Sequence, residues 1–336
     1  MKKIPNTDVV IIGAGPVGLF AVFECGMLGL KSVVVDSLEA IGGQCTALYP
    51  EKPIYDIPAY PQVSGGDLIT NLEAQAAPFN PQYLLNQQVI SVTKSDENTF
   101  EVTTSKDTQI SCKAIIIAAG AGAFGPNKPP LENLEAYEGS SVFYMVKKRA
   151  DFAGKKIVIA GGGDSALDWA LSLSEIADVS LIHRRDKFRA APESVSKLKD
   201  LRRAGKINLV IPSQLKALKG ENGALSHVIL DDLKGGEIEL EADILLPFYG
   251  LAAKLGPIAE WGLNLHSNTI EIDQSTSQTN VEGIYAVGDV AHYPKKLKLI
   301  LTGFGEVAQA AHDIWHRLHP NQALHMEYST TKGVPS

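Results

Sequence analysis

The sequence predicts an α/β protein, because a strand, a glycine-rich turn, a helix and a second strand occur in that order twice. Residues 8–37 read "DVVIIGAGPVGLFAVFECGMLGLKSVVVDS", and residues 155–190 read "KKIVIAGGGDSALDWALSLSEIADVSLIHRRDKFRA". Such a unit starts a parallel sheet covered by helices. With 336 residues the chain is long enough for two domains, one built on each unit.

The composition narrows the class of protein. At 45% hydrophobic and 21% charged residues the chain is typical of a soluble globular protein, and its net charge of −7 argues against nucleic-acid binding. Asp8 and the glycine turn interrupt the first apolar run, and no run of ~20 apolar residues occurs. We therefore expect a cytoplasmic protein with no membrane partner.

The residues that commonly bind metals do not form a recognisable site. The three cysteines, at positions 25, 45 and 112, have no metal-ligand spacing. His312, His316 and His319 fit one helix face, but no HExxH base or cysteine accompanies them. A polar helix face explains these histidines better, so we expect no metal.

The first glycine turn has the residues of a dinucleotide site. Gly13 permits the tight turn, Gly15 lets a pyrophosphate approach the backbone, and Gly18 allows close helix packing. The free N–H groups at the start of the helix also favour a pyrophosphate. Asp36 ends the predicted strand at 32–35, where a carboxylate accepts hydrogen bonds from an adenosine ribose. A glycine-rich structural turn is the alternative.

The second turn has the same glycine pattern but a different charge at its second strand. Its three fingerprint positions are held by Gly161, Gly163 and Ala166. Arg184 lies 18 residues beyond Ala166, as Asp36 lies 18 residues beyond Gly18. The basic residues that suit a ribose 2′-phosphate are Arg184, Arg185 and Arg189. NADP is therefore favoured over NAD, and the alternative is a solvated basic helix face.

A site for a ribose and a site for a phosphorylated ribose in one chain suggest FAD and NADP(H). Two mobile substrates of this kind would be unusual, so the first nucleotide is expected to be a bound cofactor.

The motifs together resemble those of thioredoxin reductase over most of the chain. They occur in the order "GAGPVGL", "GGQ", "AAG", "GGGDSA", "HRRDKFRA", "YAVGDV". The resemblance implies two Rossmann-like three-layer domains, with an FAD domain of residues 1–120 and 253–336 interrupted by an NADP domain of residues 121–252. It implies that Asp289 binds the ribityl chain of the flavin. A helix beginning near Gly303 would direct its N-terminus at the flavin, where its dipole stabilises negative charge.

Both places where relatives carry a redox-active cysteine pair lack it here. Cys45 is followed five residues later by Pro50, and the CxxC of thioredoxin reductase corresponds to residues 145–148, which read "MVKK". We expect Cys45 to be a packed residue, with a reactive thiol as the alternative. Electrons would then leave to an acceptor outside the chain.

A narrower resemblance is to the thioredoxin-reductase-like ferredoxin–NADP reductases of bacteria, also called type 2. It rests on "GGQCTALYPEKPIYDIPAYP", "TGFGE" and an extension after the last helix. It implies that Tyr49 stacks on one flavin face, and that Tyr328 from the partner subunit's tail covers the other. The further FAD contacts that it implies are Gln44, Val89, Phe124 and Thr330. Surface packing is the alternative for both tyrosines. Val17 departs from the pattern, because relatives often have a hydroxyl residue there.

The motifs and the resemblance together predict an FAD-dependent reductase, namely a ferredoxin–NADP reductase. They also predict that it works as a homodimer. NADPH would deliver hydride to flavin N5, electrons would pass singly to ferredoxin or flavodoxin, and no side chain would be catalytic. One alternative is an NADPH-dependent flavin or quinone reductase, or diaphorase, and another is a non-catalytic redox-sensing protein. Basic clusters at 147–149 and 295–298 could steer an acidic partner, or could simply be solvated charge.

Overall fold

The computed structural model describes residues 2–96, 98–324 and 333, and the chain forms two compact units. Unit 1 consists of residues 1–124 and 253–336, and unit 2 of residues 125–252. The sequence placed these boundaries at 120/121 and 252/253. The chain crosses between the units in two strands that pair with each other, β9 (Ala123–Pro126) and β17 (Leu251–Lys254).

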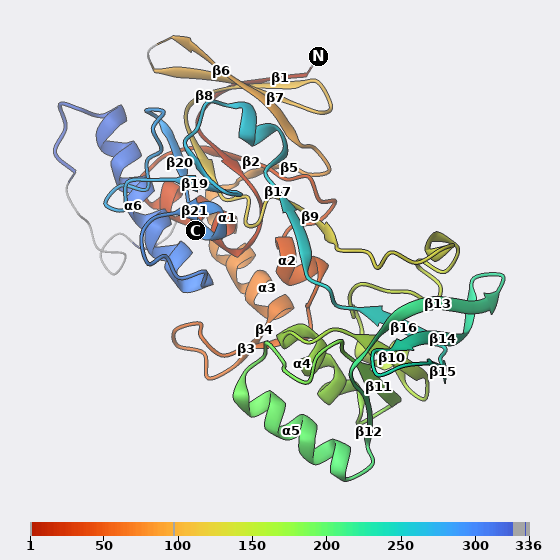
Figure 1. Cartoon of the computed structure of the whole chain (residues 1–336). Helices are drawn as coiled ribbons and strands as arrows, with labels where there is room; N and C mark the ends of the chain where they lie inside the picture. Colours follow the sequence, from red (N-terminus) through yellow and green to blue (C-terminus); the bar gives the residue numbers. More distant parts are fainter. Residues whose placement is uncertain (1, 97, 325–332, 334–336) are drawn as a thin grey trace. The chain divides into compact units, whose positions relative to one another are not determined.

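A seven-stranded sheet forms the centre of unit 1, with the order β5-β2-β1-β8-β7-β6 and β20 beside β8 (Figure 1). Its strands are β1 (Lys2–Ile12), β2 (Ser32–Val35), β5 (Gln82–Leu84), β6 (Val89–Asp96), β7 (Thr99–Thr104), β8 (Thr108–Ile117) and β20 (Ile284–Ala286). β5, β2, β1, β8 and β20 are parallel, whereas β6 and β7 are antiparallel. β8 joins the antiparallel strands to the parallel ones, since it pairs antiparallel with β7 and, further along, parallel with β20.

Helices cover one face of this sheet. They are α1 (Pro16–Met27), α2 (Gly43–Ala47), α3 (Gly65–Ala76) and α6 (Ile300–Leu318). α1 packs on both α3 and α6, which lies beside it in Figure 1. Val9 and Ile11 of β1 pack against the helices, while Val10 and Ile12 pack on the opposite face. Burial on both faces explains why the strand is apolar at successive positions.

α6 begins earlier than the sequence predicted. Its first residue is Ile300, three positions before Gly303. Ile300 and Phe304, one turn apart, pack against the same apolar cluster, so the turn before Gly303 is held in the helix as well.

Small elements complete unit 1, and several of them cover the second face of the sheet. Its short strands are β3 (Pro53–Ile54), β4 (Val63–Ser64), β18 (Leu265–His266), β19 (Thr269–Glu271) and β21 (Ala291–His292). Its 3-10 turns are η1 (Ala77–Phe79), η4 (Gly256–Glu260) and η5 (Gly288–Val290). Ile258 of η4 and Ile270 of β19 pack into the core on that face.

Unit 2 repeats the arrangement on a smaller scale. Its parallel sheet has the order β12-β11-β10-β16, with β10 (Lys156–Ala160), β11 (Asp178–Ile182), β12 (Ile207–Val210) and β16 (Ile244–Pro247). Its remaining elements are α4 (Asp164–Leu173), α5 (Pro192–Arg203), η2 (Leu134–Ala136), η3 (Arg149–Phe152) and the antiparallel β13 (Ser213–Glu221), β14 (Ala224–Asp232) and β15 (Glu237–Glu241). In both units the first strand lies between the second and fourth strands of the parallel sheet, as in a dinucleotide-binding half. Within the described part of the chain, no helix is long and apolar enough to span a membrane.

Candidate nucleotide-binding sites

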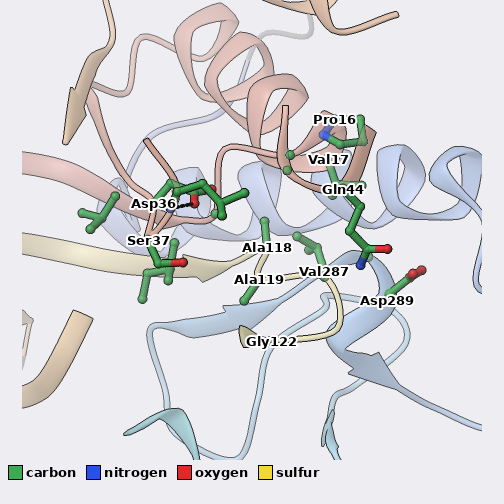
Figure 2. Close-up of a pocket in the computed structure, with 18 of the residues that line it drawn as sticks. Pro16, Val17, Asp36, Ser37, Gln44, Ala118, Ala119, Gly122, Val287 and Asp289 are labelled. Carbon is green, nitrogen blue, oxygen red and sulfur yellow. Dashed lines mark hydrogen bonds between the residues drawn. The ribbon is translucent and has the colours of Figure 1, made fainter. Parts of the chain in front are cut away.

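A cavity of about 170 Å³ lies in unit 1 where β1, β8 and β20 end and α1 begins. Figure 2 shows Asp36 and Ser37 at one end of it and Gln44 and Asp289 at the other, with Ala118 and Ala119 between them. The carboxyl ends of parallel strands are where open α/β sheets bind nucleotides. The cavity therefore lies where the first glycine fingerprint predicted a site.

The glycine turn forms the cavity wall because side chains would not fit there. Gly13 has φ +111°, and a Cβ on it would lie 2.4 Å from the carbonyl oxygen of Ala118. A Cβ on Gly18 would lie 1.9 Å from the carbonyl oxygen of Gly13, so α1 can approach β1 only with glycine there. Gly15 faces Gly43, whose Cβ would lie 3.1 Å from the Gly15 Cα. The two glycines leave a narrow cradle of bare backbone that suits a pyrophosphate.

Asp36 is held in a fixed orientation at its end of the cavity. One carboxylate oxygen accepts a hydrogen bond of 2.6 Å from the Ala14 N–H, and the other accepts one of 2.8 Å from the Leu38 N–H. Burial raises the pKa of the Asp36 carboxyl, while the two N–H donors act in the opposite direction. Each carboxylate oxygen has a second lone pair for a ribose hydroxyl.

At the other end, α2 and η5 supply the polar groups. Gln44 lies on α2, and Asp289 lies on η5 after the strand β20. The Cys45 thiol donates to the Tyr49 hydroxyl over 3.8 Å. Burial raises the pKa of both side chains, so thiol and phenol are neutral at ordinary pH. The site thus has one carboxylate at each end and neutral groups around Tyr49.

Most of the predicted FAD residues meet around this cavity. Those that line it are Gly13, Gly15, Asp36, Gln44, Tyr49, Val89 and Asp289, and Gly18 supports the loop from below. Phe124 belongs to β9, but its side chain lies outside what the structure describes, as do Tyr328 and Thr330. Contact of any of these residues with FAD stays a prediction.

Several lining residues escaped the sequence analysis. Ser37, Gly43, Gln88 and Ile300 also border the cavity. Of these, Gly43 had a usable signal, because it follows Gly42 in the "GGQ" motif and both have positive φ. Ser37, Gln88 and Ile300 belong to no sequence motif that would have identified them as lining residues.

In unit 2 the second glycine turn is equally crowded. A Cβ on Gly161 would lie 2.7 Å from the Phe248 carbonyl oxygen and 2.9 Å from the Cβ of Ala166, which is buried. Gly163 is the N-cap of α4. Gly162 is a further requirement that the fingerprint missed, since its Cβ would lie 2.3 Å from the His183 ring. The turn is therefore shaped by close packing on both sides.

The arginines of unit 2 are placed beside that turn. The Arg189 N–H donates to the Gly162 carbonyl oxygen over 2.7 Å, which holds the arginine loop against the glycines. Arg184, Arg185 and Arg189 are exposed, and none has an ion-pair partner in the part of the chain that the structure describes. Burial and the three arginines lower the pKa of His183, so its ring is neutral. Three uncompensated cations near a helix N-terminus suit a phosphate.

The structure gives no place for a redox disulfide. All three cysteines are free and buried. Met145 is half-buried, Val146 is buried, and Lys147 and Lys148 are exposed. Within the described residues, no three metal-ligating side chains cluster.

One expectation about surface charge is wrong in part. Lys296 is not available to a partner, because its side chain is 5% exposed and forms an ion pair with Glu306. In the other basic cluster, Arg149 donates to the Ser172 carbonyl oxygen and pairs with Glu175. The sequence could not show these ion pairs, because each partner belongs to another segment that only the fold brings close.

We expect Cys45→Ser to change steady-state electron transfer from NADPH, measured per bound flavin, by less than about twofold. The buried thiol is neutral and has no second cysteine to form a disulfide with. A loss of more than about tenfold, equivalent to about 1.4 kcal/mol in barrier height, would show that a thiol takes part.

Comparisons with known proteins show the family of the chain. The family described as pyridine nucleotide-disulphide oxidoreductase matches residues 7–313. A ferredoxin–NADP reductase of Rhodospirillum rubrum is 61% identical over 334 residues, covering 98% of this chain and 97% of that protein. One of Rickettsia canadensis is 62% identical over 328 residues, covering 97% of both.

Superposition on solved structures identifies the fold of this chain. Thioredoxin reductase of Lactococcus lactis superposes with a TM-score of 0.77 at 28% identity, covering 92% of this chain and 98% of that one. Thioredoxin reductase of T. acidophilum has a TM-score of 0.79 at 24% identity, covering 93% and 99%. The predicted thioredoxin-reductase-like α/β fold is therefore confirmed. By sequence and by fold, the chain belongs to the pyridine nucleotide-disulphide oxidoreductase family, among the ferredoxin–NADP reductases with a thioredoxin-reductase-like fold.

Proposed function

We propose that the protein transfers electrons between NADPH and ferredoxin or flavodoxin, with FAD bound in the unit 1 cavity and NADP(H) at the arginine loop of unit 2. The observation that carries this proposal is the contrast between the two sites. The site in unit 1 has the buried carboxylate of Asp36 where a ribose would bind. The site in unit 2 has exposed arginines at the corresponding place, and these have no ion-pair partner among the described residues. The 61% identical relatives named ferredoxin–NADP reductase support it.

The residues of unit 1 fit FAD in their order along the cavity. Asp36 would hold the adenosine ribose, and the facing Gly15 and Gly43 would admit the pyrophosphate. Gln44 and Asp289 would bind the ribityl and ring portion, and Tyr49 would shield one face of the ring. When bound, FAD supplies hydride acceptance and single-electron release, so the protein supplies orientation and electrostatics.

The acceptor is proposed to be a separate protein because this chain has no dithiol. Its cysteines are buried and unpaired, which leaves no disulfide to reduce. Ferredoxin and flavodoxin are the one-electron acceptors implied by the relatives' names and by the resemblance. A small quinone or free flavin is the second candidate, since it too would take electrons without a dithiol in this chain.

An anaerobic titration tests the proposal. The purified protein should release FAD and no FMN on denaturation, because FMN lacks the adenosine ribose that Asp36 would bind. NADPH should bleach the flavin absorbance, and added ferredoxin should restore it. Release of FMN, or reoxidation by quinone far faster than by ferredoxin or flavodoxin, would overturn the assignment.

We also propose that the active form is a cytoplasmic homodimer in which the C-terminal extension of one subunit, with Tyr328 and Thr330, covers the flavin of its partner. The resemblance supports this placement of Tyr328 and Thr330. Sedimentation of the full chain should give a dimer, and deletion of residues 321–336 should change the flavin spectrum. A monomer with an unchanged spectrum after the deletion would contradict it.

A further inference from the structure

A buried cluster of charges lies behind the Asp289 end of the cavity. Glu306, on the second turn of α6, is only 4% exposed. Its carboxylate forms an ion pair with Lys296, and each of the two side chains is 5% exposed. The Tyr293 hydroxyl donates to the same carboxylate oxygen as Lys296, over 2.8 Å. Neither side chain of the ion pair lines the cavity.

The second oxygen of Glu306 connects this cluster to the cavity wall. It accepts a hydrogen bond of 2.7 Å from the N–H of Gly288, the residue directly before Asp289. Gly288 has φ +74° and opens η5, so this bond holds a turn that few other residues would adopt. The bond therefore restrains the backbone of the turn that carries Asp289.

The same face of α6 is in close contact with this turn. A Cβ on Gly303, one helical turn before Glu306, would lie 3.2 Å from the Gly288 Cα and 2.5 Å from Val17. Ile300, the first residue of α6, lines the cavity. Any shift of the Gly288 turn relative to α6 would move Asp289 and the helix N-terminus relative to each other.

Stability alone is a weak reason for a buried ion pair, because apolar residues of similar volume often stabilise as well. A carboxylate can do what an apolar residue cannot, since it accepts from Gly288, Tyr293 and Lys296 together. Burial and the hydrogen bond to Glu306 raise the pKa of Tyr293 to about 12, so this donor keeps its proton. Lys296 balances the charge that the acceptor brings into the interior.

We propose that Glu306 is a positioning residue for the redox end of the cofactor site. It ties the Gly288–Asp289 turn to α6, with Lys296 and Tyr293 holding its carboxylate in place. It thereby orients Asp289 and the first turn of α6 toward the flavin. This inference rests on the proposed binding of FAD in unit 1, and it concerns residues that do not contact the cofactor themselves.

Two double variants test it with matched charge and size. Glu306→Gln with Lys296→Met keeps an oxygen acceptor for the Gly288 N–H, whereas Glu306→Leu with Lys296→Met does not. Neither leaves a buried charge unpaired. The measurements are the dissociation constant of FAD from apoprotein, the midpoint potential of the bound flavin, and the unfolding temperature of each apoprotein.

We expect the glutamine form to bind FAD within about threefold of the unmodified protein. The leucine form should bind at least about tenfold more weakly, equivalent to about 1.4 kcal/mol. Its flavin should have a more negative midpoint potential, because the helix N-terminus no longer stabilises the reduced state as well. The leucine apoprotein should also unfold at a lower temperature, because the buried Gly288 N–H has lost its acceptor. The midpoint potential therefore separates the two roles, since a purely structural role of the acceptor would lower the unfolding temperature without shifting the potential of the bound flavin.

Equal FAD affinity and equal potential in the two double variants would overturn the inference. If the leucine form does not fold, the glutamine form decides, since a tenfold loss of FAD affinity despite its acceptor would also overturn it. Failure of the unmodified protein to bind FAD would instead refute the proposed function. No NADPH or ferredoxin enters these measurements, so the two failures are distinct.

Discussion

Replacing Arg184 and Arg185 together with glutamine is expected to raise the KM for NADPH by about a hundredfold or more and to change the KM for NADH by less than about threefold. Each charge-assisted hydrogen bond contributes about 1.5–3 kcal/mol, and 1.4 kcal/mol corresponds to a factor of ten. Both arginines are exposed and have no ion pair with a described residue, so their charge is available to a 2′-phosphate. NADH lacks that phosphate and should be insensitive.

The matched control is Arg202→Gln, which removes an exposed arginine at the end of α5. It should leave the ratio of kcat/KM for NADPH to that for NADH unchanged, as measured with an artificial acceptor. A ratio that stays constant in the Arg184 and Arg185 variant would mean that these side chains only face solvent. Coenzyme choice would then have to come from elsewhere.

Gly18→Ala is expected to abolish the retention of FAD during purification, or to weaken its binding by about a hundredfold. The new Cβ would lie 1.9 Å from the Gly13 carbonyl oxygen and 2.9 Å from its carbon. Backbone atoms cannot move aside as a flexible side chain can, so α1 would have to move away from the turn at the end of β1. That movement would open the pyrophosphate cradle, as the ratio of FAD to protein would record.

Gly305→Ala is the control for this substitution. Gly305 also lies in a helix, but among the described residues no atom other than those of its chain neighbours and its own helix backbone lies within 4 Å of the position of its Cβ. Alanine in a helix interior is favoured over glycine by about 1 kcal/mol, so this variant should retain FAD and unfold at the same or a higher temperature. Full FAD content in the Gly18→Ala protein would show that the close contact of α1 with the glycine turn is not needed.

The sequence was sufficient to predict the repeated unit of strand, glycine turn, helix and strand. It was also sufficient to predict that the two copies bind different nucleotides. A strand, turn and helix are set by neighbouring residues, so the fingerprints at Gly13 and Gly161 could be found by pattern. Asp36 and Arg184 occupy the same place in the two copies, which makes their opposite charges directly comparable. The missing dithiol was also visible, because it depends on residue identity alone.

Tertiary packing was needed for everything that joins distant parts of the chain. Gly43 faces Gly15 across 28 positions, and Gly162 is required because the His183 ring packs on it. Lys296 read as surface charge in a basic run, yet the fold buries it against Glu306. A local pattern records which groups a segment carries, whereas burial and hydrogen-bond partners arise from the segments packed against it. For that reason the two nucleotide classes could be inferred from the order of residues, but the support behind Asp289 became visible only in the folded chain.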